Sequence, residues 1–230
     1  MNTSFSKRTK MVTTLAMFSA LAFITTFICS FVPKVAGFLS LEIKDAVITL
    51  CSLLFGPVSG LVIAVIVPII ESFTISVTGW YGLIMNVLSS ATFCLVTGLI
   101  YKYRRSFYGA VIALFAGVFS VTAVMMLANL FITPLYLTKV MGFPWSMSDV
   151  AEMIPTVLLP FNFLKSTLNA SIVLLIYKPI SKALKRAKIL EGSSLSVTNI
   201  QVDYKKTAVI SAIALLIIVL SLVLIFTVVG

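Results

Sequence analysis

Long apolar segments, separated by short polar stretches, dominate this chain of 230 residues. A helix of about 20 apolar residues, rising about 1.5 Å per residue, spans the roughly 30 Å hydrocarbon core of a bilayer. The alternating strands of a membrane barrel do not contain apolar runs of this length. We therefore predict an all-α integral membrane protein with no soluble domain. The segments assigned to the membrane are 11–32, 46–77, 80–101, 107–138, 151–177 and 207–229.

The segment 46–77 contains Gly56-Pro57, a pair that breaks helices. We predict two short spans, one on each side of this break, which brings the count to six before residue 188. The predicted organisation is a six-helix membrane domain at 1–188, a polar cytoplasmic linker at 189–206 and a seventh transmembrane helix at 207–229.

The composition agrees with a membrane protein, because 60% of the residues are hydrophobic, 10% are charged and the mean hydropathy is +1.15. Soluble domains carry about 25% charged residues. The net charge of +10 comes mostly from basic clusters at 7–10, 102–105 and 178–188. Such clusters mark cytoplasmic loops, where anionic lipid attracts them, so membrane orientation explains the charge better than nucleic acid does. We predict that the N-terminus lies inside and that Gly230 lies outside.

Polar side chains within the spans gather toward the outer side of the membrane. A lysine at the centre of a span costs about 2.5–3.5 kcal/mol, so Lys165 needs a partner or a function. Asn162, Lys165 and Asn169 are spaced i, i+3 and i+7 and therefore share one helical face. Asn129 and Glu71 fall at a similar height in other spans. We predict an outward-facing polar pocket for an organic solute.

Several further polar or aromatic residues have two interpretations. Trp80 and Tyr81 begin a span and fit either an interfacial aromatic belt or the pocket. Asn86 and Asn169 fit either hydrogen bonding between helices or the pocket.

The loop between the first two spans carries the charged residues Glu42, Lys44 and Asp45. A lysine within a span is stabilised by a nearby acid, since a buried charge needs a partner. A structural ion pair of Lys165 with Glu71 or Asp45 is therefore the alternative to a solute contact.

Signatures of catalysis and of metal binding are missing from the sequence. The chain has no histidine, no G-x-S-x-G motif and no phosphate-binding G-x-x-x-x-G-K-[ST] loop. Its three cysteines lie within apolar segments and are not closely spaced, which argues against a disulfide framework or a zinc site. We interpret them as small buried hydrophobic residues. We expect neither an enzyme nor a metal or cofactor, and any energy for transport must come from partner proteins.

Two motifs resemble those of the riboflavin-specific S-components of energy-coupling factor (ECF) transporters. The segment 159–184 is similar to the sixth helix of that family and contains P-F-N-x-x-K at 160–165. The motif N-x-x-x-T-P-L-Y at 129–136 is similar to one that precedes this helix in the family.

Two regions near the N-terminus add to the resemblance. The pattern F-L-x-x-x-x-x-D at 38–45 resembles the loop that caps the vitamin, and we count Leu41 and Asp45 of this loop among the candidate binding residues. Ala16 and Ala20 resemble the small-residue motif on the first helix that docks on the transmembrane T-component.

The resemblance implies a six-helix bundle in the bacterial plasma membrane that captures riboflavin or a related flavin from outside. A T-component and two ATPase subunits would then supply the energy for uptake. The implied ligand contacts are Asn129, Asn162 and Lys165. The alternatives are an S-component for a different vitamin or small metabolite, and a membrane scaffold protein without a small ligand.

The chain departs from the family pattern in two motifs. Its third helix reads P-I-I-E at 68–71 where a K-N pair is usual, and the loop reads K-D-A-V at 44–47 where S-D-[IV]-P is common. The seventh span is additional. These departures concern the identity of the vitamin more than the fold.

Overall fold

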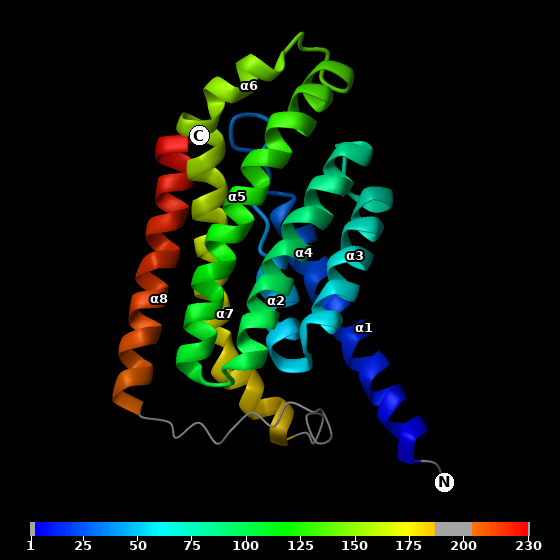
Figure 1. Ribbon diagram of the computed structural model, residues 1–230, viewed down its shortest axis with the longest axis vertical. Helices are drawn as coiled ribbons and strands as arrows, with labels where there is room; N and C mark the ends of the chain where they lie inside the picture. The colour runs from blue at the N-terminus through cyan, green and yellow to red at the C-terminus, as the bar shows by residue number, and fades with distance from the viewer. Residues whose placement is uncertain (1–2, 187–203, 230) are drawn as a thin grey trace.

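The computed structural model describes residues 3–186 and 204–229, and these are helical apart from the connecting loops and one isolated bridge between Val35 and Leu39. This confirms the predicted all-α class. The linker predicted at 189–206 lies largely outside the described residues, as does Gly230. The helices are α1 (Thr3–Cys29), α2 (Lys44–Phe55), α3 (Pro57–Thr74), α4 (Gly79–Tyr103), α5 (Phe107–Lys139), α6 (Met147–Met153), η1 (Ile154–Leu158), α7 (Leu159–Arg186), α8 (Tyr204–Leu224) and η2 (Ile225–Val229) (Figure 1).

Five helical segments among the described residues are long and apolar enough to cross a membrane. α8 contributes a shorter apolar stretch, Ala212–Thr227. The five segments are Arg8–Cys29, Pro57–Thr74, Gly79–Tyr103, Phe107–Lys139 and Met147–Leu184.

The predicted helix break at Gly56-Pro57 is confirmed. α2 ends at Phe55, Gly56 adopts a φ of 99°, and Pro57 begins α3 at a position where its missing N–H costs nothing. α2 itself has 12 residues, or about 18 Å of helix, which is less than the hydrocarbon thickness. Figure 1 shows that the preceding α1–α2 loop lies behind α5 and that α2 lies in the lower half of the bundle. Non-helical backbone at this depth is tolerated only where protein buries it or where it lines a cavity.

α2 lies at the centre of the bundle, and nearly all of its side chains are buried. Close packing around it depends on small residues: a Cβ atom added to Gly60 or Gly98 would meet the side chain of Ser52 at 2.6 Å or 2.1 Å. Ser52 Oγ in turn donates a hydrogen bond of 2.7 Å to the carbonyl oxygen of Cys94 on α4. α2, α3 and α4 therefore form a tightly packed unit, as small residues permit between membrane helices.

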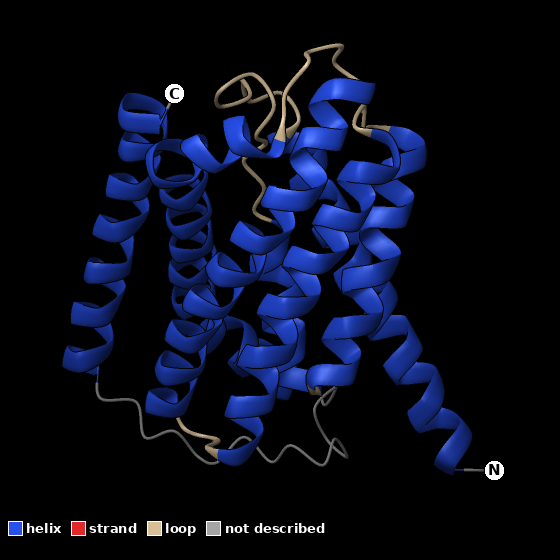
Figure 2. Cartoon of the chain, turned by 45° about the horizontal axis from the view of Figure 1, so that its top comes forward, coloured by secondary structure: helices blue, strands red, loops and turns tan. Residues whose placement is uncertain are grey.

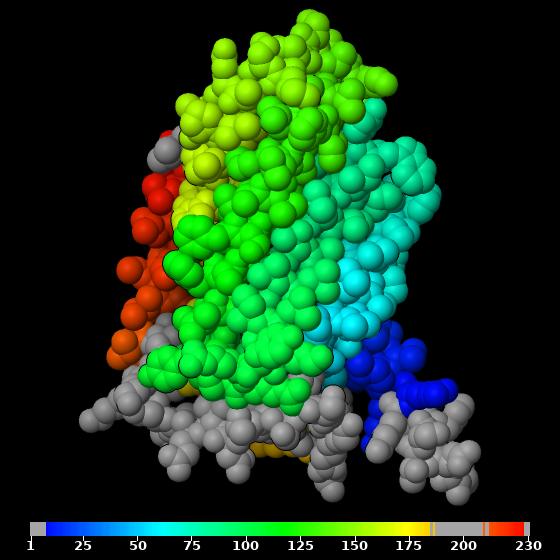
Figure 3. All heavy atoms as spheres, viewed as in Figure 1, coloured from blue at the N-terminus to red at the C-terminus, as the bar shows by residue number. Residues whose placement is uncertain are grey.

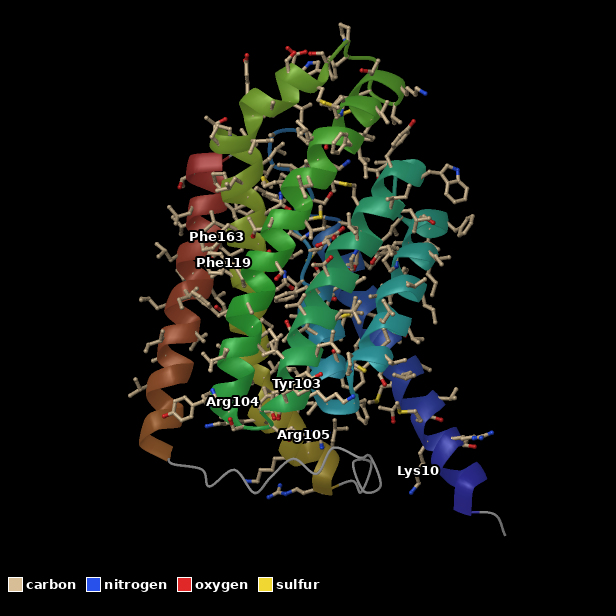
Figure 4. The ribbon with its side chains drawn as sticks, in the orientation of Figure 1. Lys10, Tyr103, Arg104, Arg105, Phe119 and Phe163 are labelled. Atoms are coloured by element: carbon tan, nitrogen blue, oxygen red, sulfur yellow. The ribbon has the colours of Figure 1, made fainter. Side chains whose placement is uncertain are left out.

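The basic residues lie at one end of the bundle. Lys10 on α1 and Arg104 and Arg105 after α4 are all found at the lower end in Figure 4. This arrangement is the one expected if an even number of spans separates the two clusters. Loops also connect the helices at the opposite end of the bundle (Figure 2). In the space-filling view, α4 and α5 form the near face and α8 lies at its left edge (Figure 3).

Candidate solute-binding site

A cavity of about 390 Å³ opens among the helix ends that lie opposite the basic end. Its wall is formed by the C-terminal ends of α1, α3 and α5, the N-terminal ends of α4 and α7, and the α1–α2 loop. The volume falls within the range of small-molecule sites, about 300–1,000 Å³. Its lining includes Thr26, Leu41, Glu42, Glu71, Tyr81, Met85, Asn86, Asn129, Tyr136, Phe161, Asn162 and Lys165.

α7 contributes Phe161, Asn162 and Lys165 to the cavity wall. Asn162 Nδ2 donates a hydrogen bond of 2.8 Å to the carbonyl oxygen of Leu158 one turn earlier, which orients the amide. An amide nitrogen carries two hydrogens, so one donor remains after this bond. The α7 wall therefore combines an aromatic ring, an amide and an ammonium group.

α5 presents a second amide in the same way. Asn129 is 1% exposed, and its Nδ2 donates to the carbonyl oxygen of Met125 at 2.7 Å. Its Oδ1 accepts a hydrogen bond of 2.8 Å from Thr133 Oγ1. These two bonds fix the orientation of the amide and leave one N–H hydrogen for a ligand. The two motifs that carried the family resemblance thus meet at one cavity.

A chain of four alternating charges lies beside the cavity. Lys44 Nζ is 2.5 Å from Glu71 Oε2 and 3.1 Å from Glu42 Oε2, and Lys165 Nζ is 3.1 Å from the same Glu42 oxygen. The side chain of Lys44 is fully buried and that of Glu71 is 2% exposed. Buried charges persist in proteins when they are paired, and this set has two of each sign. We call Glu42, Lys44, Glu71 and Lys165 the charge cluster.

One carboxylate oxygen of the charge cluster has no hydrogen-bond partner among the described residues. Glu71 Oε1 is buried without a hydrogen-bond partner among the described residues, and Glu71 lines the cavity. Glu42 belongs to the loop between the spans, where burial raises the pKa of its carboxyl group. The ammonium groups of Lys165 and Lys44 outweigh burial and lower the pKa of Glu42 from 4.5 to about 2. Glu42 is therefore ionised at neutral pH.

Two candidates are placed away from the cavity. Asp45 is 4% exposed and accepts hydrogen bonds from Ser89 Oγ, at 3.3 Å, and from Ser90 Oγ, so it joins α2 to α4. Trp80 is 72% exposed, which favours the belt interpretation for this residue. Tyr81, by contrast, lines the cavity.

The structure also bears on three residues for which the sequence left two interpretations open. The acid paired with Lys165 is Glu42, and neither Glu71 nor Asp45 takes that position. Asn169 is fully buried and connects helices: its Nδ2 donates to the carbonyl oxygen of Glu42 at 2.9 Å, and its Oδ1 accepts from the amide N–H of Ala46 at 2.9 Å. Asn86 lies in the cavity wall.

Sequence reasoning did not identify Glu42 or Lys44 as parts of the site. Both were noted only as loop charges, although a signal was present: three charged residues stand next to an apolar helix on the side away from the basic clusters. Charges at that place are expensive unless they pair with residues inside the bundle.

The fold and the site together define a class: a multi-pass helical membrane protein that encloses a small-molecule pocket within its bundle. Residues 10–177 match the model of a known family, the substrate-specific component of ECF transporters. The chain belongs to this family, which confirms the resemblance found in the sequence.

Two comparisons refine this assignment. The riboflavin transporter RibU of Staphylococcus aureus (strain TCH60) is 29% identical over 185 residues, which are 78% of this chain and 95% of that protein. A solved structure of the S component of a bacterial ECF transporter superimposes with a TM-score of 0.64 at 29% identity, covering 78% of this chain and 99% of its own. α8 begins at Tyr204, beyond the last residue of the family match.

Proposed function

We propose that this protein is the riboflavin-binding subunit of an ECF importer and captures riboflavin, or a related flavin, from outside the cell. The observation that carries the proposal is the meeting of Asn129, Asn162 and Lys165 at one cavity of about 390 Å³. The similarity to a riboflavin transporter over most of the chain supports the choice of vitamin.

The chemistry of the cavity suits a flavin. The flavin ring is flat and largely apolar, with carbonyl oxygens and an imide N–H along one edge, and aromatic walls such as Phe161 and Tyr81 match its faces. The amides of Asn129 and Asn162 each retain a donor for the carbonyl edge. Lys165 has three ammonium hydrogens, and a bond from one of them to a carbonyl oxygen would contribute about 1.5–3 kcal/mol.

Acceptors are present for the remaining polar groups of the ligand. Glu71 lines the cavity, and its buried Oε1 has no hydrogen-bond partner among the described residues, so a hydroxyl or imide N–H of the ligand that reaches this oxygen would satisfy it. An unsatisfied buried acceptor costs about 1–3 kcal/mol, and ligand binding would recover part of that cost.

Energy for uptake would come from a T-component and two ATPase subunits, with the chain residing in the bacterial plasma membrane. Ala16 and Ala20 on α1 are exposed, so this surface is free to approach a partner helix. The protein itself acts by binding, without a catalytic step.

Titration of the purified protein with riboflavin tests the proposal, because flavin fluorescence is quenched when the ring is buried. We expect saturable quenching with a 1:1 end point and a rise in melting temperature. Asn162→Leu should weaken binding, while Lys102→Met, an exposed residue at the basic end, serves as the control that should not. The proposal would be refuted if the wild-type protein quenched no fluorescence at micromolar riboflavin and another vitamin raised its melting temperature in a thermal-shift screen. That vitamin would then be the ligand.

A further inference from the structure

α8 presents one buried face and one exposed face. Ala214, Ser221 and Ile225 are 3%, 2% and 0% exposed, and their spacing of seven and four residues places them on one side of the helix and its continuation. Outside this face, Ile213 is 51% exposed and Val219 is 59% exposed. One side of α8 is therefore packed on protein and the other is available to lipid.

α8 packs against α7 and lies at the left edge of the bundle in Figure 1, and Ile225 of the packed side shares an apolar cluster with residues of α7. The apolar residues of α7 and η1 in this contact recur at helical spacing, while Asn162 and Lys165 face the cavity from an adjacent side of the same helix. α7 thus separates α8 from the cavity. The residues of this stripe, which runs from η1 into α7, are Val157, Phe161, Leu164, Leu168 and Ile172.

The stripe and Ile225 belong to one apolar cluster, which also contains part of the α1–α2 loop. Val35 and Leu41 of the loop are 2% and 5% exposed and belong to one contiguous apolar cluster with Ile225. Val35 and Leu39 also exchange backbone hydrogen bonds of 2.9 Å and 3.0 Å, which close a short turn. Leu39 and Leu41 belong to the same cluster and also line the cavity, whereas Val35 lies in the cluster and does not line the cavity, so the loop connects the cavity wall to the cluster that includes Ile225.

We propose that α8 is a brace for the α1–α2 loop and that its end at Ile225 slows the release of the bound solute. Ile225 does not line the cavity, so it is a positioning residue that acts through Leu41 and Phe161. Without Ile225, the loop would lose packing on the side away from the cavity and would open more readily. The effect on solute release rests on the proposed function, whereas the effect on the loop does not.

Hydrogen–deuterium exchange of the full-length apo protein tests the brace directly. Ile225→Ala should accelerate exchange at 33–42, whereas Ile213→Ala, the same substitution on the exposed side of α8, should not. Ile225→Leu keeps the apolar volume and should restore most of the protection. Unchanged exchange at 33–42 in Ile225→Ala would overturn the proposal.

Riboflavin release, measured by competition after loading, tests the consequence. We expect Ile225→Ala to release the vitamin roughly tenfold faster with an association rate close to that of the wild type, since packing defects act mainly on dissociation. Leu114→Ala on α5 creates a cavity in the main core, away from this cluster, and controls for general destabilisation. Equal acceleration in Leu114→Ala at a matched loss of melting temperature would refute the brace. If the wild type binds no riboflavin, the proposed function fails, and the exchange experiment alone decides the role of α8.

Discussion

Lys165→Met and Lys44→Met should have opposite consequences, although both substitutions remove a lysine from the charge cluster. Glu42 Oε2 is 3.1 Å from both ammonium groups, so it keeps Lys44 when Lys165 is lost. Glu71 is paired with Lys44 alone within the cluster, at 2.5 Å, and is 2% exposed. Loss of Lys44 therefore leaves Glu71 as a buried charge without an ion-pair partner among the described residues.

The expected magnitudes follow from these contacts. Breaking a buried ion pair from one side costs about 3–5 kcal/mol, so Lys44→Met should be strongly destabilising. Lys165→Met should change the free energy of unfolding by about 1 kcal/mol or less, because Glu42 remains paired and a charge within the membrane is removed. Its effect should appear in riboflavin affinity: the loss of a charge-assisted bond of about 1.5–3 kcal/mol weakens binding roughly 10- to 150-fold.

The assay is a pair of measurements on each variant: the melting temperature in detergent without ligand, and the dissociation constant for riboflavin. The double variant Lys44→Met/Glu71→Gln should regain much of the stability that Lys44→Met loses, because the unpaired charge is gone. Wild-type affinity in Lys165→Met would remove this lysine from the ligand contacts. Wild-type melting in Lys44→Met would show that the pair with Glu71 contributes little.

Three further predictions concern docking, topology and pH. Ala16→Trp should prevent co-purification with the T-component while riboflavin affinity stays unchanged; normal assembly would exclude α1 as the docking surface. A cysteine introduced at 228–230 should react with an impermeant reagent only from outside, and labelling from the cytoplasmic side alone would contradict a seventh span. The pKa of Glu42 is depressed from 4.5 to about 2, so its contribution to stability is complete above pH 4.5 and is lost as the pH falls toward 2. Melting temperature should therefore fall more steeply below pH 4.5 in the wild type than in Glu42→Gln.

Those features of the fold that depend on local sequence were predictable. Gly56-Pro57 ends one helix and begins the next because the chemistry of these two residues requires it. The shared face of Asn162 and Lys165 follows from helical spacing alone. Both properties are contained in a few consecutive residues, so no knowledge of the tertiary structure is needed.

The conformation of the α1–α2 loop was not predictable in the same way. The loop is held by bonds to residues far along the chain, such as Asn169 Nδ2 to the carbonyl oxygen of Glu42 and Lys165 Nζ to the Glu42 carboxylate. A non-helical segment has no periodicity that shows which of its side chains point inward. For the same reason, the prediction that Lys165 needs an acidic partner named Glu71 and Asp45, which is wrong, because the partner is Glu42.

The two departures from the family pattern are coupled in the structure, because each contributes one residue to the same ion pair. Lys44 stands in the loop motif and Glu71 in the third-helix motif, and their charged groups are 2.5 Å apart. Glu71 without Lys44 would be a buried charge with no ion-pair partner in the charge cluster, at a cost of several kcal/mol, whereas the two residues together form a pair. The amides of Asn129 and Asn162, which keep the family motifs, lie at the same cavity. A flavin edge could thus still meet the amide donors of Asn129 and Asn162, and the paired departures are compatible with the proposed ligand.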